Sequence, residues 1–432
     1  MRTERTQNFW LARAFALASL CAVLGGGATA AMLDQFFPEG IPGYGTSAGV
    51  TVRSRLHPEQ EPLGIRLGSF LVHPQIQTGL GYDSNVLGGR ASNGSWLARN
   101  QPSILFSSDW SRNAVGGYFS ADDKRYLDQP AQSRTDGTMA VAGSVDVGRD
   151  RVSAAVAHVA QHEDRNRLDA LPSDRPIAFT FDDARLSYAA GFGRWTVTPS
   201  AEVSRWRYDG TTVMGLPASQ AYRDRDVIEG ATTLQYELAP LRSLLLVGRI
   251  TGQSYPNSLP GEPSQHSTGF QLLAGFDYDD DAVWRYRMMV GGEVRQFASF
   301  PTRTALIAEA DVTWMPSGLT TVHGQLGRTI EDAAQPGVSG YTFTNAKLTI
   351  DHEYMRNLVF SASLGVQEAA YLQGGSQAGF SAGIGATWLV DRMVSVSATY
   401  NVTSYGGGHP NGTIASEPST RNLALLMVHL GL

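Results

Sequence analysis

The sequence predicts an all-β protein, a single antiparallel transmembrane β-barrel of about 18 strands. Three observations favour this fold. From residue 66 onward, stretches of about 10–15 residues alternate apolar and polar side chains. The turns between these stretches are alternately short and long, as in bacterial outer-membrane barrels. After the first thirty residues no apolar run reaches 18 residues, so no membrane helix is expected.

Residues 1–30 have the pattern of a secretory signal peptide. Arg2, Arg5 and Arg13 form its basic region, residues 14–24 form an apolar core too short to span a bilayer, and residues 28–30 are small, as a cleavage site requires. Cys21 follows the bulky Leu20, which argues against a lipoprotein. We therefore expect cleavage before Ala31 and export.

Residues 31–65 form the next segment, which we interpret as an irregular periplasmic stretch. Proline and glycine interrupt any regular element, for example at residues 38, 42–43 and 58–62. The sequence leaves two alternatives open for this segment: it is mobile, or it plugs the lumen.

Residues 66–432 are expected to form the barrel. In residues 394–400, Val, Val, Ala and Tyr alternate with Ser, Ser and Thr. The polar face of such strands carries mainly Ser, Thr, Gly, Gln and Asn with scattered charges, which indicates an enclosed, wet lumen rather than bulk water. The expected strands are 69–83, 97–110, 114–127, 137–148, 151–163, 178–193, 195–208, 223–238, 242–255, 266–279, 283–298, 303–315, 319–329, 341–354, 357–370, 378–390, 393–405 and 420–432.

One connection breaks the alternation of short and long turns. The link at Phe300-Pro301-Thr302 is short where a long loop is due, so a count of 16 strands is the alternative. Tryptophan positions support the assignment, because every tryptophan after the signal lies near a predicted strand end, where barrels carry aromatic girdles. Five of them, expected at the short-turn rim, are Trp110, Trp195, Trp284, Trp314 and Trp388; Trp96 and Trp206 adjoin long loops.

Composition excludes several functional classes. The only cysteine, Cys21, lies in the signal, so the exported chain has no thiol, which suits an oxidising periplasm. The formal charge is −6, and the chain lacks the basic footprint of a nucleic-acid-binding protein. No cofactor motif, metal-ligand spacing or catalytic triad stands out, and we expect residues 162–164 to be a solvated stretch. We therefore expect neither an enzyme nor a bound cofactor, with a rim-located enzyme as a remote alternative.

Charged side chains on the polar face of the strands are the candidate functional residues. Alternation directs the apolar neighbours of these residues toward lipid, because charge facing lipid costs about 2–4 kcal/mol for Arg or Lys at mid-depth. Such residues would line a pore and tune its selectivity, or form a static network of cross-strand pairs. The predicted pore-lining residues are Arg285, Arg287, Glu293, Arg295, Glu309, Asp311, Lys347, Asp351, Glu353, Glu202 and Arg249.

A short motif opens the first strand. Residues 64–74 have the sequence GIRLGSFLVHP, and Tyr82, Asp83 and Asn85 follow in GYDSNV at residues 81–86. On their own, Asp83 and Asn85 indicate turn chemistry more than a cation site. Together the two stretches resemble the start of the β-barrel porin type 2 family. That resemblance implies an outer-membrane barrel, and some relatives, the EpsL-like proteins, accompany exopolysaccharide export.

The predicted function is a porin-like channel for small hydrophilic solutes, because barrels of 16–18 strands leave an aqueous lumen. The alternative is an outer-membrane component of exopolysaccharide export or biosynthesis machinery. The expected location is the bacterial outer membrane, with both termini in the periplasm. The expected partners are outer-membrane lipid, the barrel-assembly machinery, periplasmic chaperones, and either polysaccharide or small hydrophilic solutes.

Overall fold

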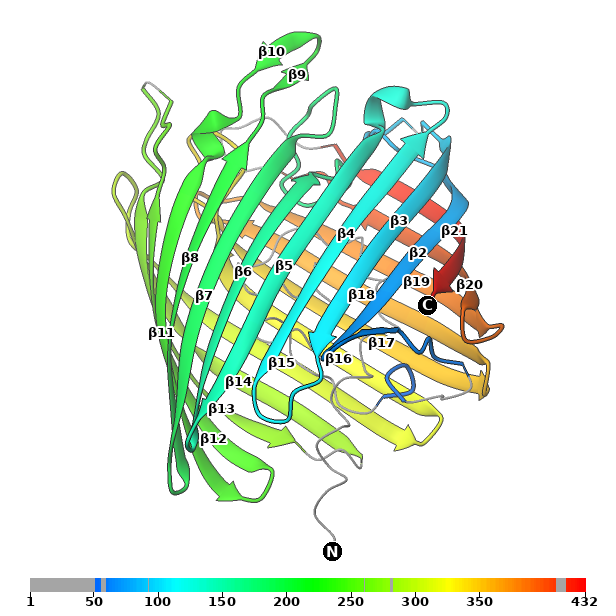
Figure 1. Cartoon of the computed structure of the whole chain (residues 1–432). Coiled ribbons are helices and arrows are strands. Elements are labelled where there is room, and N and C mark those ends of the chain that lie inside the picture. Colours follow the sequence, from blue (N-terminus) through cyan, green and yellow to red (C-terminus); the bar gives the residue numbers. More distant parts are fainter. Residues whose placement is uncertain (1–50, 56–59, 92, 260, 280–282, 409–416) are drawn as a thin grey trace, which may run out of the picture.

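A computed structural model describes residues 51–55, 60–91, 93–259, 261–279, 283–408 and 417–432. The predicted signal at residues 1–30, and residues 31–50 of the segment after it, lie outside the described residues. The described chain forms one closed β-barrel whose strands are tilted (Figure 1). No helix in the described part is long and apolar enough to cross a bilayer.

The barrel wall contains seven strands from β2 to β8 and eleven from β11 to β21, 18 in all. Each pairs antiparallel with its neighbours. The strands are β2 (Phe70–Asp83), β3 (Ser95–Ser108), β4 (Ala114–Tyr126), β5 (Arg134–Val147), β6 (Asp150–His162), β7 (Ala178–Phe192), β8 (Trp195–Tyr208), β11 (Arg225–Ala239), β12 (Arg242–Ser254), β13 (Ser267–Asp279), β14 (Trp284–Phe297), β15 (Arg303–Ser317), β16 (Thr320–Glu331), β17 (Tyr341–Met355), β18 (Leu358–Tyr371), β19 (Ser376–Leu389), β20 (Val394–Tyr405) and β21 (Ser419–Gly431).

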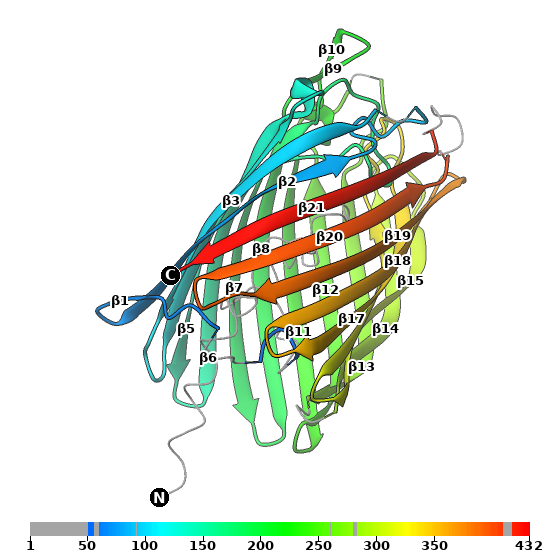
Figure 2. The same cartoon turned by 90° about the vertical axis from the view of Figure 1, so that its right-hand side faces the viewer.

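The first and last wall strands close the barrel. β2 pairs with β21 from Gln75 opposite Gly431 to Asp83 opposite Leu423, and the two strands lie side by side in Figure 2. Closure leaves no strand edge in the membrane zone, where an unpaired backbone N–H or C=O would cost several kcal/mol (about 2–7 by transfer data).

Three short strands lie outside this wall. β1 (Ile65–Leu67) pairs with the start of β2, Ile65 lying opposite Val72. β9 (Thr211–Val213) and β10 (Leu216–Ala218) form a hairpin that projects from the rim with the long loops (Figure 1). Met214 and Gly215 between them both have positive φ, 51° and 77°, as a two-residue type I′ turn requires.

The predicted architecture is confirmed. All 18 expected strands are present, and their ends agree within three residues. The short link around Phe300 is a real connection between β14 and β15, so the alternative count of 16 is wrong. We call the end with the longer connections the long-loop rim and the opposite end the short-turn rim.

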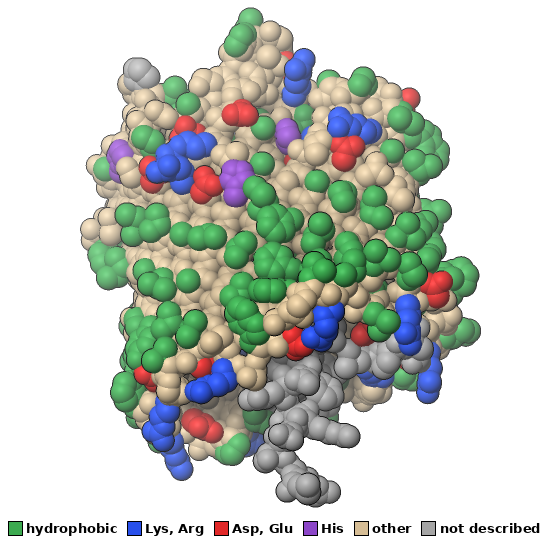
Figure 3. Space-filling view, in the orientation of Figure 1, with side chains coloured by type: hydrophobic (Ala, Val, Ile, Leu, Met, Phe, Trp, Pro, Cys, Tyr) green, Lys and Arg blue, Asp and Glu red, His purple; other side chains and the backbone are tan. Residues whose placement is uncertain are grey.

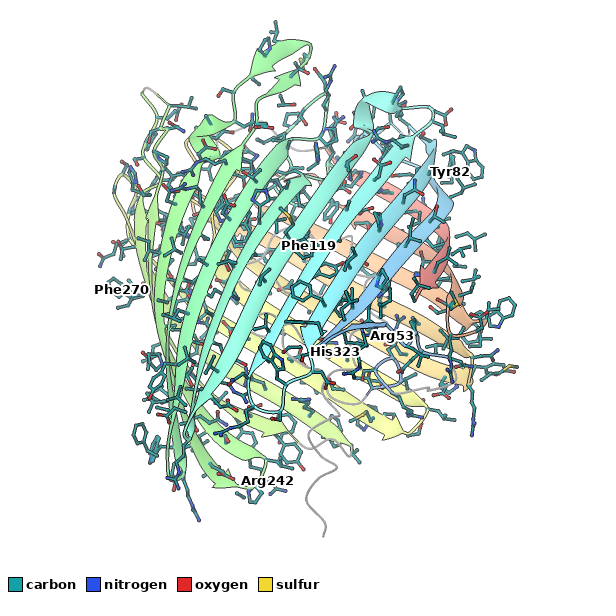
Figure 4. The ribbon with its side chains drawn as sticks, in the orientation of Figure 1. Arg53, Tyr82, Phe119, Arg242, Phe270 and His323 are labelled. Carbon is teal, nitrogen blue, oxygen red and sulfur yellow. The ribbon has the colours of Figure 1, made fainter. Side chains whose placement is uncertain are left out.

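The outer surface has an apolar middle zone. On the face shown in Figure 3, charged side chains gather toward the two ends and hydrophobic ones lie between them. Outward residues of the strands are exposed and apolar, as at Leu246 (41%), Leu306 (64%) and Ile384 (63%). Phe270 points away from the wall in Figure 4. This is the band that lipid contacts in a transmembrane barrel.

The five tryptophans expected at the short-turn rim lie there with exposed side chains. Trp284 and Trp314 stack across β14 and β15 with ring centroids 5.3 Å apart, and Trp195 lies 4.7 Å from Tyr236. Trp96 is also exposed, at the long-loop rim. Amphipathic rings at both rims match the two headgroup zones of a bilayer.

Trp206 differs from this expectation. Its side chain points inward and is only 4% exposed, packed against Phe179 and Phe181 with the Arg225 guanidinium 4.3 Å from its ring. The physical reason is register: exposed Val203 and Arg205 take the outward positions of β8, so Trp206 must face the lumen. The inner wall is therefore less uniformly polar than the sequence pattern indicates.

Two glycines on the inner face of β13 and β14 leave room for the backbones of these strands to lie close together. A Cβ at Gly275 would lie 2.0 Å from the Met288 carbonyl oxygen, and one at Gly291 would lie 1.9 Å from that of Leu272. Side chains there would push β13 and β14 apart. Glycine at such positions lets a sheet coil tightly enough to close.

The register predicts opposite effects for arginine on the two faces. Leu246→Arg or Ile384→Arg places a charge in the lipid zone, at a cost of about 2–4 kcal/mol near mid-depth. We expect a smaller folded fraction for these variants in heat-modifiability gels. Gln271→Arg, which faces the lumen, is the control and retains the wild-type folded fraction; a larger defect for it would contradict the register.

Candidate functional site: a lumen narrowed by two inward-folded loops

The predicted pore-lining residues all belong to inward positions of the wall, on β8, β12, β14, β15 and β17. They do not form one patch. The pairing of β14 with β15 places Arg287 opposite Asp311, whereas Arg295 lies opposite Arg303 near the other end. The residues therefore divide among three levels of the lumen.

The level nearest the short-turn rim on β14 contains Arg285 and Arg287. Arg287 approaches Asp277 of β13 at 3.2 Å, and Asp311 contacts His323 of β16 at 2.9 Å. Arg287 and Asp311 keep exposed fractions of 46% and 40% in their side chains. Mobile ions can therefore reach this mixed group of charges.

The middle level is a bridge across four strands. Arg249 of β12 reaches Glu309 of β15 at 2.5 Å and also donates to Gln271 of β13 at 3.2 Å. Gln271 in turn donates to Glu293 of β14 at 3.1 Å. On the neighbouring part of the wall, two strands from Arg249, Glu202 of β8 forms an ion pair with Arg185 of β7 at 3.0 Å. These four charged side chains are therefore paired within the wall.

The level at the long-loop rim joins the wall to a loop. Arg295 is 3% exposed, forms an ion pair with Asp332 just beyond β16, and donates to Ser267 at 3.1 Å. Arg225 of β11 approaches the same carboxylate at 3.7 Å. These two arginines hold the start of loop 332–340 against the inner wall.

Loop 163–177, between β6 and β7, also folds into the lumen. Glu163 is 7% exposed, accepts both terminal nitrogens of Arg223, and bonds Arg167 at 2.6 Å. We expected residues 162–164 to be solvated, and for Glu163 that expectation is wrong. The reason is that the loop turns inward, where a buried carboxylate requires cationic partners.

The two loops meet through Asp169. Its carboxylate accepts the Ala334 backbone N–H at 2.5 Å and the Tyr371 hydroxyl at 2.9 Å, while its own N–H donates to Gln377 at 3.0 Å. Asp169 has a φ of 54°, in the left-handed region that aspartate tolerates better than most residues. One side chain thus connects loop 163–177, loop 332–340 and the wall strands β18 and β19.

Beneath these loops lies a cavity of about 160 Å³. Paired arginines and carboxylates, including Arg167, Arg223 and Asp332, line it together with neutral side chains such as Gln253 and Tyr255. The cavity is large enough for a few waters or a small polar solute. Its lining presents donors and acceptors of both signs.

The loop carboxylates have shifted pKa values of opposite sign. Burial alone would raise the pKa of Glu163, but Arg167 and Arg223 more than offset burial and hold this pKa below its usual range. Burial raises the pKa of Asp169, against the hydrogen bonds from Ala334 and Tyr371. The Glu163 contribution to docking is thus present above its ordinary pKa and lost as pH falls through the lowered value.

The Tyr82-Asp83-Asn85 motif lies at the seam of the barrel. Asp83 is fully buried and accepts Arg421 of β21 at 2.6 Å and the Tyr126 hydroxyl at 3.2 Å. Asn85 donates to the Thr420 carbonyl at 3.1 Å, whereas Tyr82 faces outward beside Trp96. In the described residues no group of three or more His, Cys, Asp or Glu side chains could hold a metal ion.

The sequence matches the family model described as "Putative beta-barrel porin 2" over residues 57–415, which is well over half of the chain. The chain belongs to the β-barrel porin 2 family. The protein is therefore a porin-like channel of the outer membrane. Among proteins with curated descriptions, none matches the sequence.

Several solved outer-membrane barrels are similar in outline to this β-barrel porin 2 protein. OccK2 (OpdF) of Pseudomonas aeruginosa has a TM-score of 0.45 and 14% identity, with 84% of this chain and 98% of that chain covered. OpdK of the same organism has a TM-score of 0.44 and 11% identity, with the same coverage. The FrpB iron transporter from Neisseria meningitidis has a TM-score of 0.42 and 9% identity, covering 84% and 81%. Likeness at this level carries no inference about substrate.

The sequence did not point to the residues that narrow the lumen of this porin. Glu163, Arg167, Asp169, Arg223 and Asp332 all lie in or beside loops, where a charged residue ordinarily faces water. One signal was present: five of the seven residues from 163 to 169 are charged. Such density in a loop beside a strand end is a reason to expect inward folding and ion pairing.

Loss of one buried partner is predicted to release loop 163–177. Arg223→Gln leaves Glu163 with Arg167 alone, and removing one member of a buried pair costs about 3–5 kcal/mol. We expect faster trypsin cleavage at Arg165, Arg167 or Arg175 in the folded barrel. Arg205→Gln, which breaks an exposed pair with Asp226 on the outer surface, is the matched control. Equal cleavage rates for the two variants would contradict the docking role of Arg223.

Proposed function

We propose that small hydrophilic solutes cross the outer membrane through this lumen, and that the two inward loops and the cavity beneath them select among these solutes. The contact of Asp169 with Ala334 and Tyr371 supports the proposal most directly, because it joins two inward-folded loops and the wall inside an otherwise wide barrel. Paired charges at a constriction filter solutes by charge and size.

The proposed orientation places the long-loop rim outside the cell and the short-turn rim, with both termini, in the periplasm. Outer-membrane barrels have short periplasmic turns and longer extracellular loops. Residues 1–30 would direct export and be cleaved, residues 31–65 would form the irregular segment at the periplasmic end of the barrel, and residues 66–432 would form the barrel. Periplasmic chaperones and the barrel-assembly machinery are the proposed partners in insertion.

The alternative, a component of exopolysaccharide export machinery, is not favoured by the family match. Absence of catalysis stays a prediction. Inward ion pairs such as Arg249 with Glu309 are explained by cross-strand pairing on the lumen face of the wall, without a catalytic reaction.

Purified, folded protein is expected to produce discrete conductance steps in planar bilayers. Asp169→Ala removes the acceptor that joins the two loops, and we expect a larger unit conductance because the constriction loosens. Asp226→Ala, on the outer surface, is the control and leaves the conductance unchanged. Folded protein that inserts but conducts no ions would refute the channel function and favour the alternative, a component of exopolysaccharide export machinery.

The level near the short-turn rim predicts a selectivity change. Replacing Arg285 and Arg287 by Ser removes fixed positive charge from the lumen wall, so the reversal potential across a salt gradient shifts toward cation selectivity. Arg242→Ser is the control, because Arg242 lies on the outer face against Tyr278. An unchanged reversal potential in an open, conducting double variant would mean that these arginines serve only the wall structure.

A further inference from the structure

The segment at residues 51–55 lies inside the barrel, although it precedes every strand. The Val52 backbone N–H donates to the Thr321 hydroxyl at 3.0 Å, and Val52 itself is only 2% exposed. Thr321 belongs to an inward position of β16 and is 3% exposed. The segment therefore occupies lumen space beside the wall formed by β16, β17 and β18 (Figure 4).

Two arginines fasten this segment to β17. Arg53 Nε lies 2.7 Å from Asp351, with side-chain exposures of 10% and 11%, and the Arg53 guanidinium also donates to Ser361 of β18. Arg55 lies 3.4 Å from Glu353, which is 5% exposed. Asp351 and Glu353 are alternate residues of one strand, so both carboxylates point into the lumen.

The two ion pairs follow the same order along the segment and along β17. Arg53 pairs with Asp351 and Arg55 pairs with Glu353, and the partners of each pair are 298 residues apart in the sequence. Within the segment, Thr51 and Ser54 hydrogen-bond each other's backbone N–H groups at 2.8 and 3.1 Å. A local turn thus orients the two arginines toward β17, where they form ion pairs with Asp351 and Glu353.

We propose that Asp351, Glu353, Ser361 and Thr321 form a docking site on the inner wall for the arginine-bearing segment 51–55, and that occupancy of this site narrows the short-turn mouth. Its effect on conduction rests on the proposed channel function. Asp351 and Glu353 lie close to the end of β17 at Met355, which places the segment at this mouth. β1 remains paired to β2 outside the lumen, so a released segment stays tethered at the rim.

The docking itself is tested by engineered cysteines. The exported chain is predicted to have no cysteine, so Val52→Cys with Thr321→Cys supplies the only pair. We expect rapid oxidative cross-linking in isolated outer membranes. Val52→Cys with Thr138→Cys is the control, because Thr138 faces the lumen from β5, a different part of the wall. Failure of the first pair to cross-link, or equal cross-linking of both, would overturn the docking site.

The narrowing is tested by conductance. The cross-linked protein is expected to conduct less than the same protein after reduction. The double variant Arg53→Gln, Arg55→Gln is expected to raise the ratio of channels with segment 51–55 released to channels with it docked about tenfold, which corresponds to about 1.4 kcal/mol. The mean conductance is expected to rise accordingly. Arg66→Gln is the matched control, because Arg66 lies in β1 and forms an exposed pair with Asp109.

The two failures are distinguishable. A cross-link that forms without any change of conductance on reduction would overturn the narrowing role while leaving the docking site in place. If the wild-type protein and all variants fail to conduct, the channel function fails, and the cross-linking result still decides the docking site. Folding of each variant is checked by heat-modifiability, so that unfolded protein does not enter the comparison.

Discussion

Backbone pairing between the first and last wall strands is the constraint on which the rest of the structure depends. A bilayer offers no hydrogen-bond partner to a free strand edge, so the sheet must close. β2 and β21 meet along Gln75 to Asp83, and a buried ion pair between Asp83 and Arg421 fixes the end of this seam at the long-loop rim. Neither strand can slip by one residue without moving its charges to the lipid face.

Closure also decides where charge can go. Once alternate residues face lipid, the charged residues within the apolar zone must face inward, where they pair with one another along the inner wall. The Arg249 bridge to Glu309 and the pair of Arg185 with Glu202 are results of this sorting. A lumen of paired charges is therefore a physical consequence of the fold, and selectivity must come from charges that remain accessible to solutes, such as Arg287.

The sequence predicts the wall well because the wall obeys local rules. Period-2 alternation placed Leu246 outward and Glu309 inward, and turn length separated the two rims. Trp206 was misplaced because a tryptophan near a strand end was taken for a rim residue, while its register sends it inward. The loop contacts could not be predicted, since Glu163 and Arg223 are 60 residues apart and no periodicity relates them.

The contents of the lumen follow from the width of the barrel. A wall of 18 strands encloses more space than its own side chains fill, so chain segments without a place in the wall can fold inward. At the long-loop rim, Arg295 and Arg223 receive carboxylates from two loops; at the short-turn rim, Asp351 and Glu353 receive arginines from residues 51–55. Arginines of the wall and of the segment just before β11 are the partners at the first rim, and carboxylates of β17 are the partners at the second. Each inserted segment is therefore complementary to the rim where it is held, and the passage is narrowed at its two ends by segments that ion pairs, rather than backbone ladders, keep in place.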